Sequence, residues 1–220
     1  MNPTARTYAR TAGVLYLSTH ATSVLAVVAY DAGATTAGVL LEVALALGCL
    51  GTGVLLLLLL RPYGEARALT FALLRTLEAA VVAAGTLPML ALAWGDGTAP
   101  DAVLVDLHTA AFLVGQGLVI SVNTIVLGSL LVGSGVVPRA LGVLGVAGGA
   151  LVLGSNLAQV AGLVPQGGAV AGLCAVPVFV FEIWWAVLLL VRGLRTPADG
   201  APQHDAPDDY ADATASTGHQ

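Results

Sequence analysis

Charged residues are scarce in this sequence of 220 residues, since Asp, Glu, Lys and Arg together make up only 10% of it. Ordinary soluble domains contain about 25% charged residues. Hydrophobic residues reach 57%, and the mean hydropathy is +0.90. A chain with so little charge cannot cover a surface that faces water, so we expect lipid to be its main solvent.

Lysine is absent, and all eight basic residues are Arg. Residues 196–220 contain five Asp and no basic residue, whereas residues 1–195 contain eight acidic and eight basic residues. The net charge of −5 therefore belongs to the tail. No basic patch is available for a phosphate backbone, which argues against nucleic acid as a partner. The tail has little to bury, so we expect residues 196–220 to form a disordered acidic cytoplasmic segment.

Cysteine is nearly absent too, with Cys49 and Cys174 in separate apolar runs. This arrangement suggests two buried, inert thiols and no disulfide framework. The sequence has no HExxH or CxxC motif, so no metal or other cofactor is predicted. A haem or metal site that uses His20 and His108 stays open as an alternative, although the two lie on different apolar runs at different depths.

Long hydrophobic runs are what the sequence does contain. About 20 apolar residues cross the hydrocarbon core as a helix, and Gly-, Pro- and charge-rich segments separate the runs. "STHATS" interrupts the first run, which favours a retained span over a cleaved signal peptide. The sequence predicts an all-α integral membrane bundle of six transmembrane helices in residues 1–195, with spans at about 11–30, 38–60, 69–94, 103–132, 140–164 and 169–191.

Arginine marks alternate connections between these spans. Positive residues are retained on the cytoplasmic side of membranes. The connections at 31–37, 95–102 and 165–168 contain no Arg. We therefore expect both termini to be cytoplasmic, on the side that carries Arg6, Arg10, Arg61, Arg67, Arg139, Arg192 and Arg195.

Several motifs along the chain resemble one bacterial family. They are "TARTYARTAGVLYL" near the start, "ALLRTLEAA" in the third run, "LVGSGVVPRALGVLG" before the fifth and "PVFVFEIWWAVLLLVRG" in the sixth. In this order they resemble the family catalogued as domain of unknown function 4386, over about residues 5 to 195. The resemblance implies a multi-pass protein of the bacterial cytoplasmic membrane, and it implies no activity or catalytic residue.

Polar side chains inside the spans are the candidate functional residues. A charge at the bilayer centre costs about 2.5–3.5 kcal/mol on insertion scales, so such groups are expected to face the bundle interior and find partners. Three residues of the fourth run, spaced by eight and seven, fall within an arc of about 80° on a helix. The predicted buried polar network consists of His20, Glu42, Arg75, Glu78, His108, Gln116, Asn123, Asn156, Gln159 and Glu182.

Arg75 and Glu78 stand three residues apart in the third run, close enough to touch on a helix. One interpretation is a buried pair with Glu78, Glu182 or both that fixes helix register. The other is an ion or proton site. Three Glu outnumber the one Arg in the spans, so at least one Glu is expected to be protonated near neutral pH.

Three classes of function remain open from the sequence. The leading hypothesis is a protein that handles protons or a small solute through the His/Glu/Arg network, as transporters with two inverted halves do. A non-catalytic membrane subunit is the second; it would dock a copy of itself or another membrane protein through glycine faces such as "GCLGTG" and the Gly145–Gly149 pair. A membrane redox or metal-dependent enzyme is the third and is disfavoured, because no nucleophile–base pair or metal cluster is evident.

Overall fold

The computed structural model describes residues 3–95 and 101–194 and is almost entirely helical there. Six helical stretches in it are long and apolar enough to cross a membrane. The prediction of an all-α six-span membrane bundle is thus confirmed. The elements are α1 (Pro3–Asp31), α2 (Thr35–Leu60), the 3-10 turn η1 (Arg61–Tyr63), α3 (Glu65–Trp94), α4 (Asp101–Phe112), the π-helical segment η2 (Leu113–Val119), α5 (Ile120–Ser134), α6 (Arg139–Val160) and α7 (Ala169–Val191).

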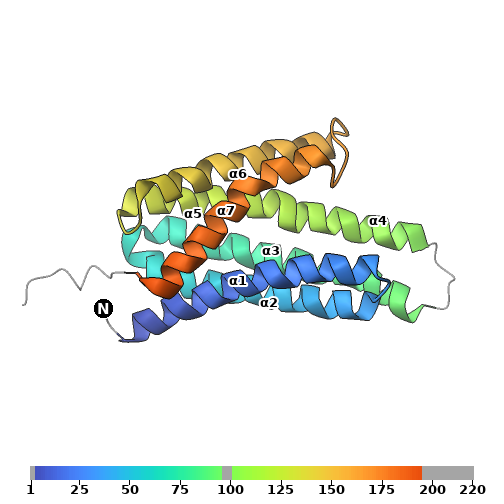
Figure 1. Cartoon of the computed structure of the whole chain (residues 1–220), viewed down its shortest axis with the longest axis horizontal. Coiled ribbons are helices and arrows are strands. Elements are labelled where there is room, and N and C mark those ends of the chain that lie inside the picture. Colours follow the sequence, from blue (N-terminus) through green and yellow to red (C-terminus); the bar gives the residue numbers. More distant parts are fainter. Residues whose placement is uncertain (1–2, 96–100, 195–220) are drawn as a thin grey trace, which may run out of the picture.

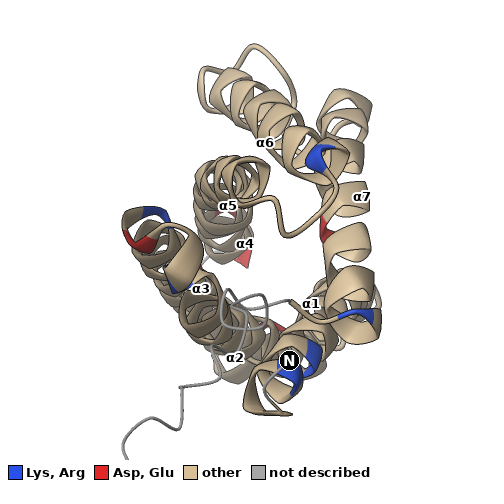
Figure 2. Ribbon diagram, turned by 90° about the vertical axis from the view of Figure 1, so that its left-hand side faces the viewer, with Lys and Arg blue, Asp and Glu red and all other residues tan. Residues whose placement is uncertain are grey.

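The helices form a ring in the order of the sequence. Viewed from one end, α1, α2, α3, the α4–α5 span, α6 and α7 follow one another around the bundle (Figure 2). Short connections keep successive helices antiparallel and adjacent, and α7 packs back against α1 to close the ring. In the side view α7 crosses α1 obliquely (Figure 1). Every span therefore has a face toward the centre.

Several span boundaries differ from those predicted, since α2 begins at Thr35 rather than near residue 38 and α3 begins at Glu65 rather than near residue 69. Helix α1 begins at Pro3 rather than near residue 11, because Ala9 and Ala12 are buried in the bundle and the helix extends beyond the apolar run. Helix α6 ends at Val160 rather than near residue 164. Gly162, which adopts the left-handed conformation with φ of 70°, ends it. The tail predicted at 196–220 lies outside the described residues.

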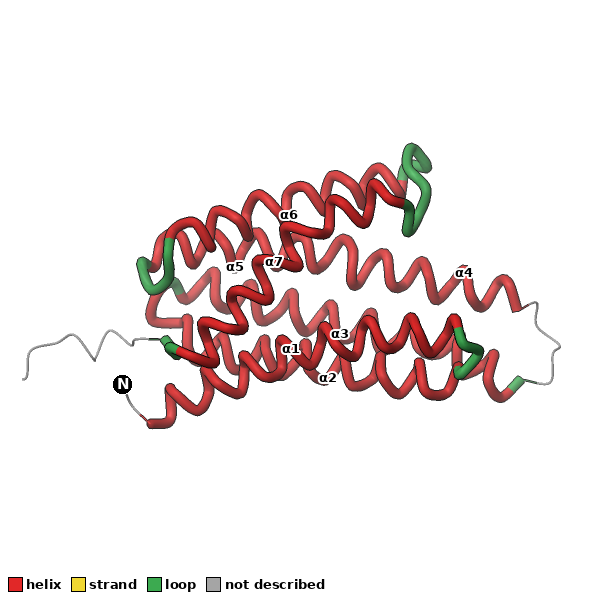
Figure 3. Tube along the Cα trace, in the orientation of Figure 1, coloured by secondary structure: helices red, strands yellow, loops and turns green. Residues whose placement is uncertain are grey.

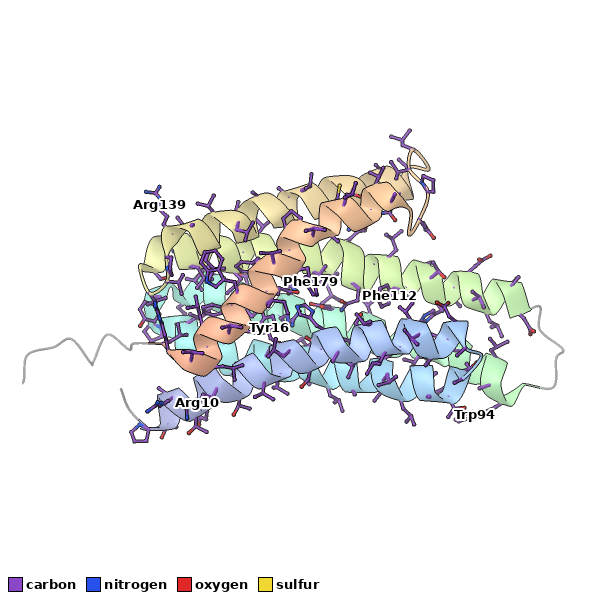
Figure 4. The ribbon with its side chains drawn as sticks, in the orientation of Figure 1. Arg10, Tyr16, Trp94, Phe112, Arg139 and Phe179 are labelled. Carbon is purple, nitrogen blue, oxygen red and sulfur yellow. The ribbon has the colours of Figure 1, made fainter. Side chains whose placement is uncertain are left out.

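The arginines of the connecting segments gather at one end of the bundle, which we call the arginine-rich end. Figure 4 shows Arg10 and Arg139 there and Trp94 at the other end, which we call the opposite end. The green connecting segments cluster at the two ends (Figure 3). Arg75 is the exception among the described arginines, since it is buried within the bundle. Assignment of the arginine-rich end to the cytoplasm stays a prediction.

The glycines predicted to pack helices do so inside the protomer. A Cβ on Gly145 would lie 2.8 Å from the Phe181 ring, and one on Gly128 would lie 2.8 Å from the Gly142 carbonyl oxygen. Such small residues let helix backbones approach closely. The protomer's own helices also occupy the positions facing Gly48, Gly53, Gly142, Gly148 and Gly149. These faces therefore give no support to docking of a partner.

The fourth span departs from the regular helix that its sequence suggested. Leu113–Val119 winds as a π-helix between α4 and α5, in the middle of the span predicted at about 103–132. A π-turn leaves part of the backbone ladder to be satisfied otherwise, and Ser121 Oγ donates to the Gly117 carbonyl oxygen at 2.5 Å. Single π-turns occur frequently at functional sites, and this one contains Gln116.

Candidate functional site

Arg75 and Glu78 form an ion pair at the centre of the bundle. Both project from α3, one turn apart, and their exposed fractions are 2% and 0%. Arg75 Nη1 donates to both carboxylate oxygens of Glu78, at 3.1 Å and 2.9 Å. Of the two carboxylates predicted as its partners, Arg75 forms its ion pair with Glu78.

Glu78 also accepts hydrogen bonds from two neighbouring spans. Gln116 Nε2 donates to Oε1 at 2.7 Å, and Asn123 Nδ2 donates to Oε2 at 2.6 Å. The Cys49 thiol on α2 is buried, as predicted, and donates to Oε1 at 3.5 Å. Both carboxylate oxygens of Glu78 therefore accept hydrogen bonds from the neighbouring spans as well as from Arg75.

Arg75 is fixed on its remaining sides by α1 and α2. Its Nε donates to Thr52 Oγ1 at 3.1 Å, and its guanidinium carbon lies 5.1 Å from the centre of the Tyr16 ring. Contact with a ring face adds a cation–π attraction. The Arg75 guanidinium group thus contacts side chains of α1 and α2 as well as Glu78 on α3. We call the Arg75–Glu78 ion pair the lock.

A cavity of about 230 Å³ opens beside this lock, and we call it the central cavity. All six spans contribute to its wall. The side chains that line it are Thr19, His20, Ser23, Leu45, Cys49, Arg75, Glu78, Gln116, Ile120, Val152, Ala175, Val178, Phe179 and Glu182. The wall therefore combines four ionisable side chains with hydroxyl, thiol and amide groups, inside a bundle that is otherwise apolar.

His20 and Glu182 face each other across α1 and α7 in the central cavity. His20 Nε2 lies 3.5 Å from Glu182 Oε2, and the Phe179 ring packs on the imidazole with ring centres 5.1 Å apart. Figure 4 labels Phe179 on α7 and Tyr16 on α1. Within residues 3–95 and 101–194, nothing donates a hydrogen bond to Glu182, and the buried His20 Nε2 atom has no hydrogen-bond partner.

A second His–Glu pair joins α2 and α4, on the side toward the opposite end. His108 Nε2 lies 3.4 Å from Glu42 Oε1, and the Tyr30 hydroxyl donates to Glu42 Oε2 at 2.9 Å. His108 Nδ1 lies 2.9 Å from the Gly85 carbonyl oxygen. Because a carbonyl oxygen only accepts, Nδ1 must carry the proton. A neutral His108 then presents the lone pair of Nε2 to Glu42.

Asn156 and Gln159 make a third polar group, near the end of α6. Gln159 Nε2 donates to Asn156 Oδ1 at 3.0 Å. Asn156 packs against Gly117 in η2, where an added Cβ would lie 3.0 Å from Asn156 Oδ1. Neither amide contacts Arg75 or Glu78 directly in the described part of the chain.

The ten residues predicted as one network thus divide into three groups. The largest surrounds the central cavity, and the other two are the Glu42–His108 pair and the Asn156–Gln159 pair. Sequence reasoning missed the contacts of Tyr30, Cys49 and Thr52. Cys49 and Thr52 carry a signal in hindsight, because they stand one turn apart in the glycine-rich part of α2. Tyr30 carries none, because a turn separates it from Glu42.

No set of three or more His, Cys, Asp or Glu side chains is grouped for metal binding in the part of the chain that the structure describes. His20 and His108 each face a different carboxylate rather than each other.

Comparison of the sequence with known proteins and family profiles shows the family of this chain. Neither the curated proteins nor the solved structures contain a match to this chain. A family profile described as "Domain of unknown function (DUF4386)" matches residues 6–193. This range covers all six spans and excludes the tail. The chain therefore belongs to the DUF4386 family, a family of multi-pass membrane proteins as its six apolar helices also indicate.

Proposed function

We propose that this protein is a carrier of the bacterial cytoplasmic membrane. In this proposal the central cavity binds a small uncharged polar solute, and the Glu182–His20 pair beside it holds a proton. The observation that carries the proposal is the buried Glu182 carboxyl group, which faces a polar cavity and lies 3.5 Å from His20 Nε2. Buried ionisable groups in a membrane span are functional candidates because they are costly to keep there.

The Arg75–Glu78 pair and the Glu182–His20 pair of the central cavity differ in how their charges are compensated. Arg75 and Glu78 neutralise each other and are satisfied by Thr52, Gln116 and Asn123. Glu182 has no such donors, and an isolated buried carboxylate would be strongly destabilised. One proton shared by Glu182 and His20 removes that charge. Glu182 is therefore the carboxyl group that we propose is protonated.

The cavity's size and charge define the solute class. About 230 Å³ is less than the roughly 300–1,000 Å³ typical of pockets for drug-sized ligands. With Arg75 paired to Glu78 and one proton on the Glu182–His20 pair, the wall has no net charge. An ion would find no counter-charge there, whereas hydroxyl, amide and imidazole groups provide hydrogen bonds to an uncharged solute.

Membrane position supports a role in transport. The site is lined by all six spans and lies inside the bundle, as solute sites of carriers with internal repeats do near the bilayer midplane. The alternate distribution of Arg in the connections supports cytoplasmic termini and hence the orientation proposed here.

Thermal unfolding of the detergent-solubilised protein tests the solute part of the proposal. The probes are glycerol, urea and acetamide, with methylammonium and acetate as charged probes of similar size. A bound ligand stabilises the folded protein by about 2.7 kcal/mol at roughly 100 times its Kd. We expect at least one uncharged probe to raise the melting temperature of the wild type relative to that of Ala175→Leu, which fills the cavity wall.

Gly172→Leu is the matched control, because it lies on the same helix with open space around its missing Cβ. This variant should keep the wild-type response. A response confined to the charged probes, or one that is equal in Ala175→Leu and the wild type for every probe, would contradict the proposed solute site.

A further inference from the structure

A second cavity of about 250 Å³ lies between the fourth span, α6 and α7. We call it the amide vestibule. Its lining residues are Thr109, Phe112, Leu113, Gln116, Gly117, Asn156, Gln159, Gln166, Gly167 and Ala171. None of these is charged, and three of the four amides come from α6 and from the α6–α7 connection. Gln166 is exposed, so it marks the side that opens outward.

The amides of α6 retain hydrogen-bonding capacity. Asn156 and Gln159 are 7% and 8% exposed. Gln159 Nε2 donates to Asn156 Oδ1 and to Ser155 Oγ, at 3.0 Å and 3.5 Å. Asn156 Nδ2 and Gln159 Oε1 have no partner among the described residues. Both atoms can therefore form hydrogen bonds with a ligand in the amide vestibule that carries complementary groups.

Gln116 connects the two cavities. Its side chain lines both the amide vestibule and the central cavity, and its Nε2 donates to Glu78. It stands in the π-helical segment η2, between Gly115 and Gly117. Gln116 is therefore shared by the walls of both cavities, on an irregular helical turn.

Gly117, next to Gln116, lies close to Asn156 in the wall of the amide vestibule. An added Cβ would lie 3.0–3.2 Å from the three terminal atoms of the Asn156 amide. Alanine at this position would press on Asn156, and valine would have to displace it. Gly154 on α6 offers the contrast, since nothing lies within 4 Å of its missing Cβ.

We infer that the amide vestibule is an entry site for a small, uncharged, hydrogen-bonding solute, which passes Gln116 to reach the central cavity. The inference rests on the proposed function for the role of the central cavity. An uncharged solute fits because the lining has amide and hydroxyl groups and no charge, so an ion that entered would lose water without gaining a counter-charge.

Thiol labelling tests the route without any need for solute binding. In a Cys49→Ser, Cys174→Ser background, Val152→Cys places a thiol in the wall of the central cavity. The probes are methyl methanethiosulfonate, which is uncharged, and its charged trimethylammonium-ethyl and sulfonatoethyl analogues. We expect the uncharged reagent to modify this thiol faster than either charged one.

Substitutions at Gly117 locate the path. We expect Gly117→Val to slow modification by about tenfold or more, which corresponds to an added barrier of about 1.4 kcal/mol, and Gly117→Ala to have an intermediate effect. Gly154→Val, the matched control, should leave the rate unchanged. Gly117→Ala keeps the test available if the valine variant does not fold, and circular dichroism with gel filtration checks folding.

Equal rates with Gly, Ala and Val at position 117, or faster reaction of a charged reagent, would overturn the inference. Failure here is distinct from failure of the proposed function. A solute that stabilises the protein while position 117 has no effect would refute only the route. A labelling rate that depends on position 117 without any stabilising solute would refute only the proposed solute site.

Discussion

Arg75 Nη1 lies 3.1 Å from one carboxylate oxygen of Glu78 and 2.9 Å from the other, so two opposite charges neutralise each other within one turn of α3. Gln116 and Asn123 add donors from the neighbouring span. Both charged side chains thus have hydrogen-bond partners besides each other. Glu182 and His20 line the same cavity without comparable hydrogen-bond partners, so they are the pair that we propose holds a proton.

Removal of Arg75 alone should destabilise the folded protein more than removal of the charges of Arg75 and Glu78 together. Arg75→Leu leaves the Glu78 carboxylate buried and without its counter-charge, and loss of one partner of a buried pair costs about 3–5 kcal/mol. In Arg75→Leu/Glu78→Gln no unpaired charge remains, while the amide oxygen still accepts from a neighbour. We expect this double variant to unfold at a higher temperature than Arg75→Leu.

The measurement is thermal unfolding in detergent, with Leu73→Ala as a control because Leu73 is 62% exposed on the lipid-facing side of α3. A double variant that is less stable than Arg75→Leu would contradict the structural role of the pair, since it would mean that an isolated Glu78 carboxylate is tolerated.

The His108 tautomer gives a second prediction. Because the Gly85 carbonyl oxygen accepts from Nδ1, neutral His108 should carry its proton on Nδ1 and present a bare Nε2 to Glu42. Nitrogen-15 NMR of histidine-labelled protein, assigned with His108→Gln, distinguishes the two tautomers. A neutral ring protonated on Nε2 would contradict the hydrogen bond from His108 Nδ1 to the Gly85 carbonyl oxygen.

The glycine contacts predict opposite effects for two alanine substitutions. A Cβ on Gly128 would lie 2.7 Å from the Val146 amide nitrogen and 2.8 Å from the Gly142 carbonyl oxygen, and these backbone atoms cannot rotate away. Overpacking of this kind typically costs about 1–3 kcal/mol. Gly154→Ala meets nothing and should stabilise α6 by roughly 0.5–1 kcal/mol, because Gly weakens helices.

Thermal unfolding of both variants in the same detergent compares the two. The close-packing account requires Gly128→Ala to melt below the wild type and Gly154→Ala at or above it. The reverse order would mean that the α5–α6 contact is looser than described.

Hydropathy was sufficient for the six spans, because lipid demands long apolar helices with internal backbone hydrogen bonds. The spacing of Arg75 and Glu78 was equally informative, since residues three apart on a helix must be neighbours. Gln116 and Asn123 could also be placed on one face, because seven residues make nearly two whole turns. These inferences need only the geometry of one helix.

Contacts between helices were harder to predict. The spacing of His20, Glu42, His108 and Glu182 says that each faces inward, but only the ring order of the helices determines that His20 faces Glu182 and that His108 faces Glu42. The π-turn at Leu113–Val119 was missed because no residue type there demands it. The contact of Cys49 with Glu78 was missed because the spacing of Cys49 and Thr52 places them on one face of α2 but does not say which helix they face.

Infrared spectroscopy of Glu182 tests the central claim most directly. We expect the wild type at neutral pH to show a C=O stretching band from a protonated carboxyl group. Glu182→Gln should remove this band while the protein remains folded. Glu65→Gln, on the exposed start of α3, should leave the band in place. A wild-type spectrum without any component that Glu182→Gln removes would show that Glu182 is ionised, and it would contradict a proton held on the Glu182 carboxyl group.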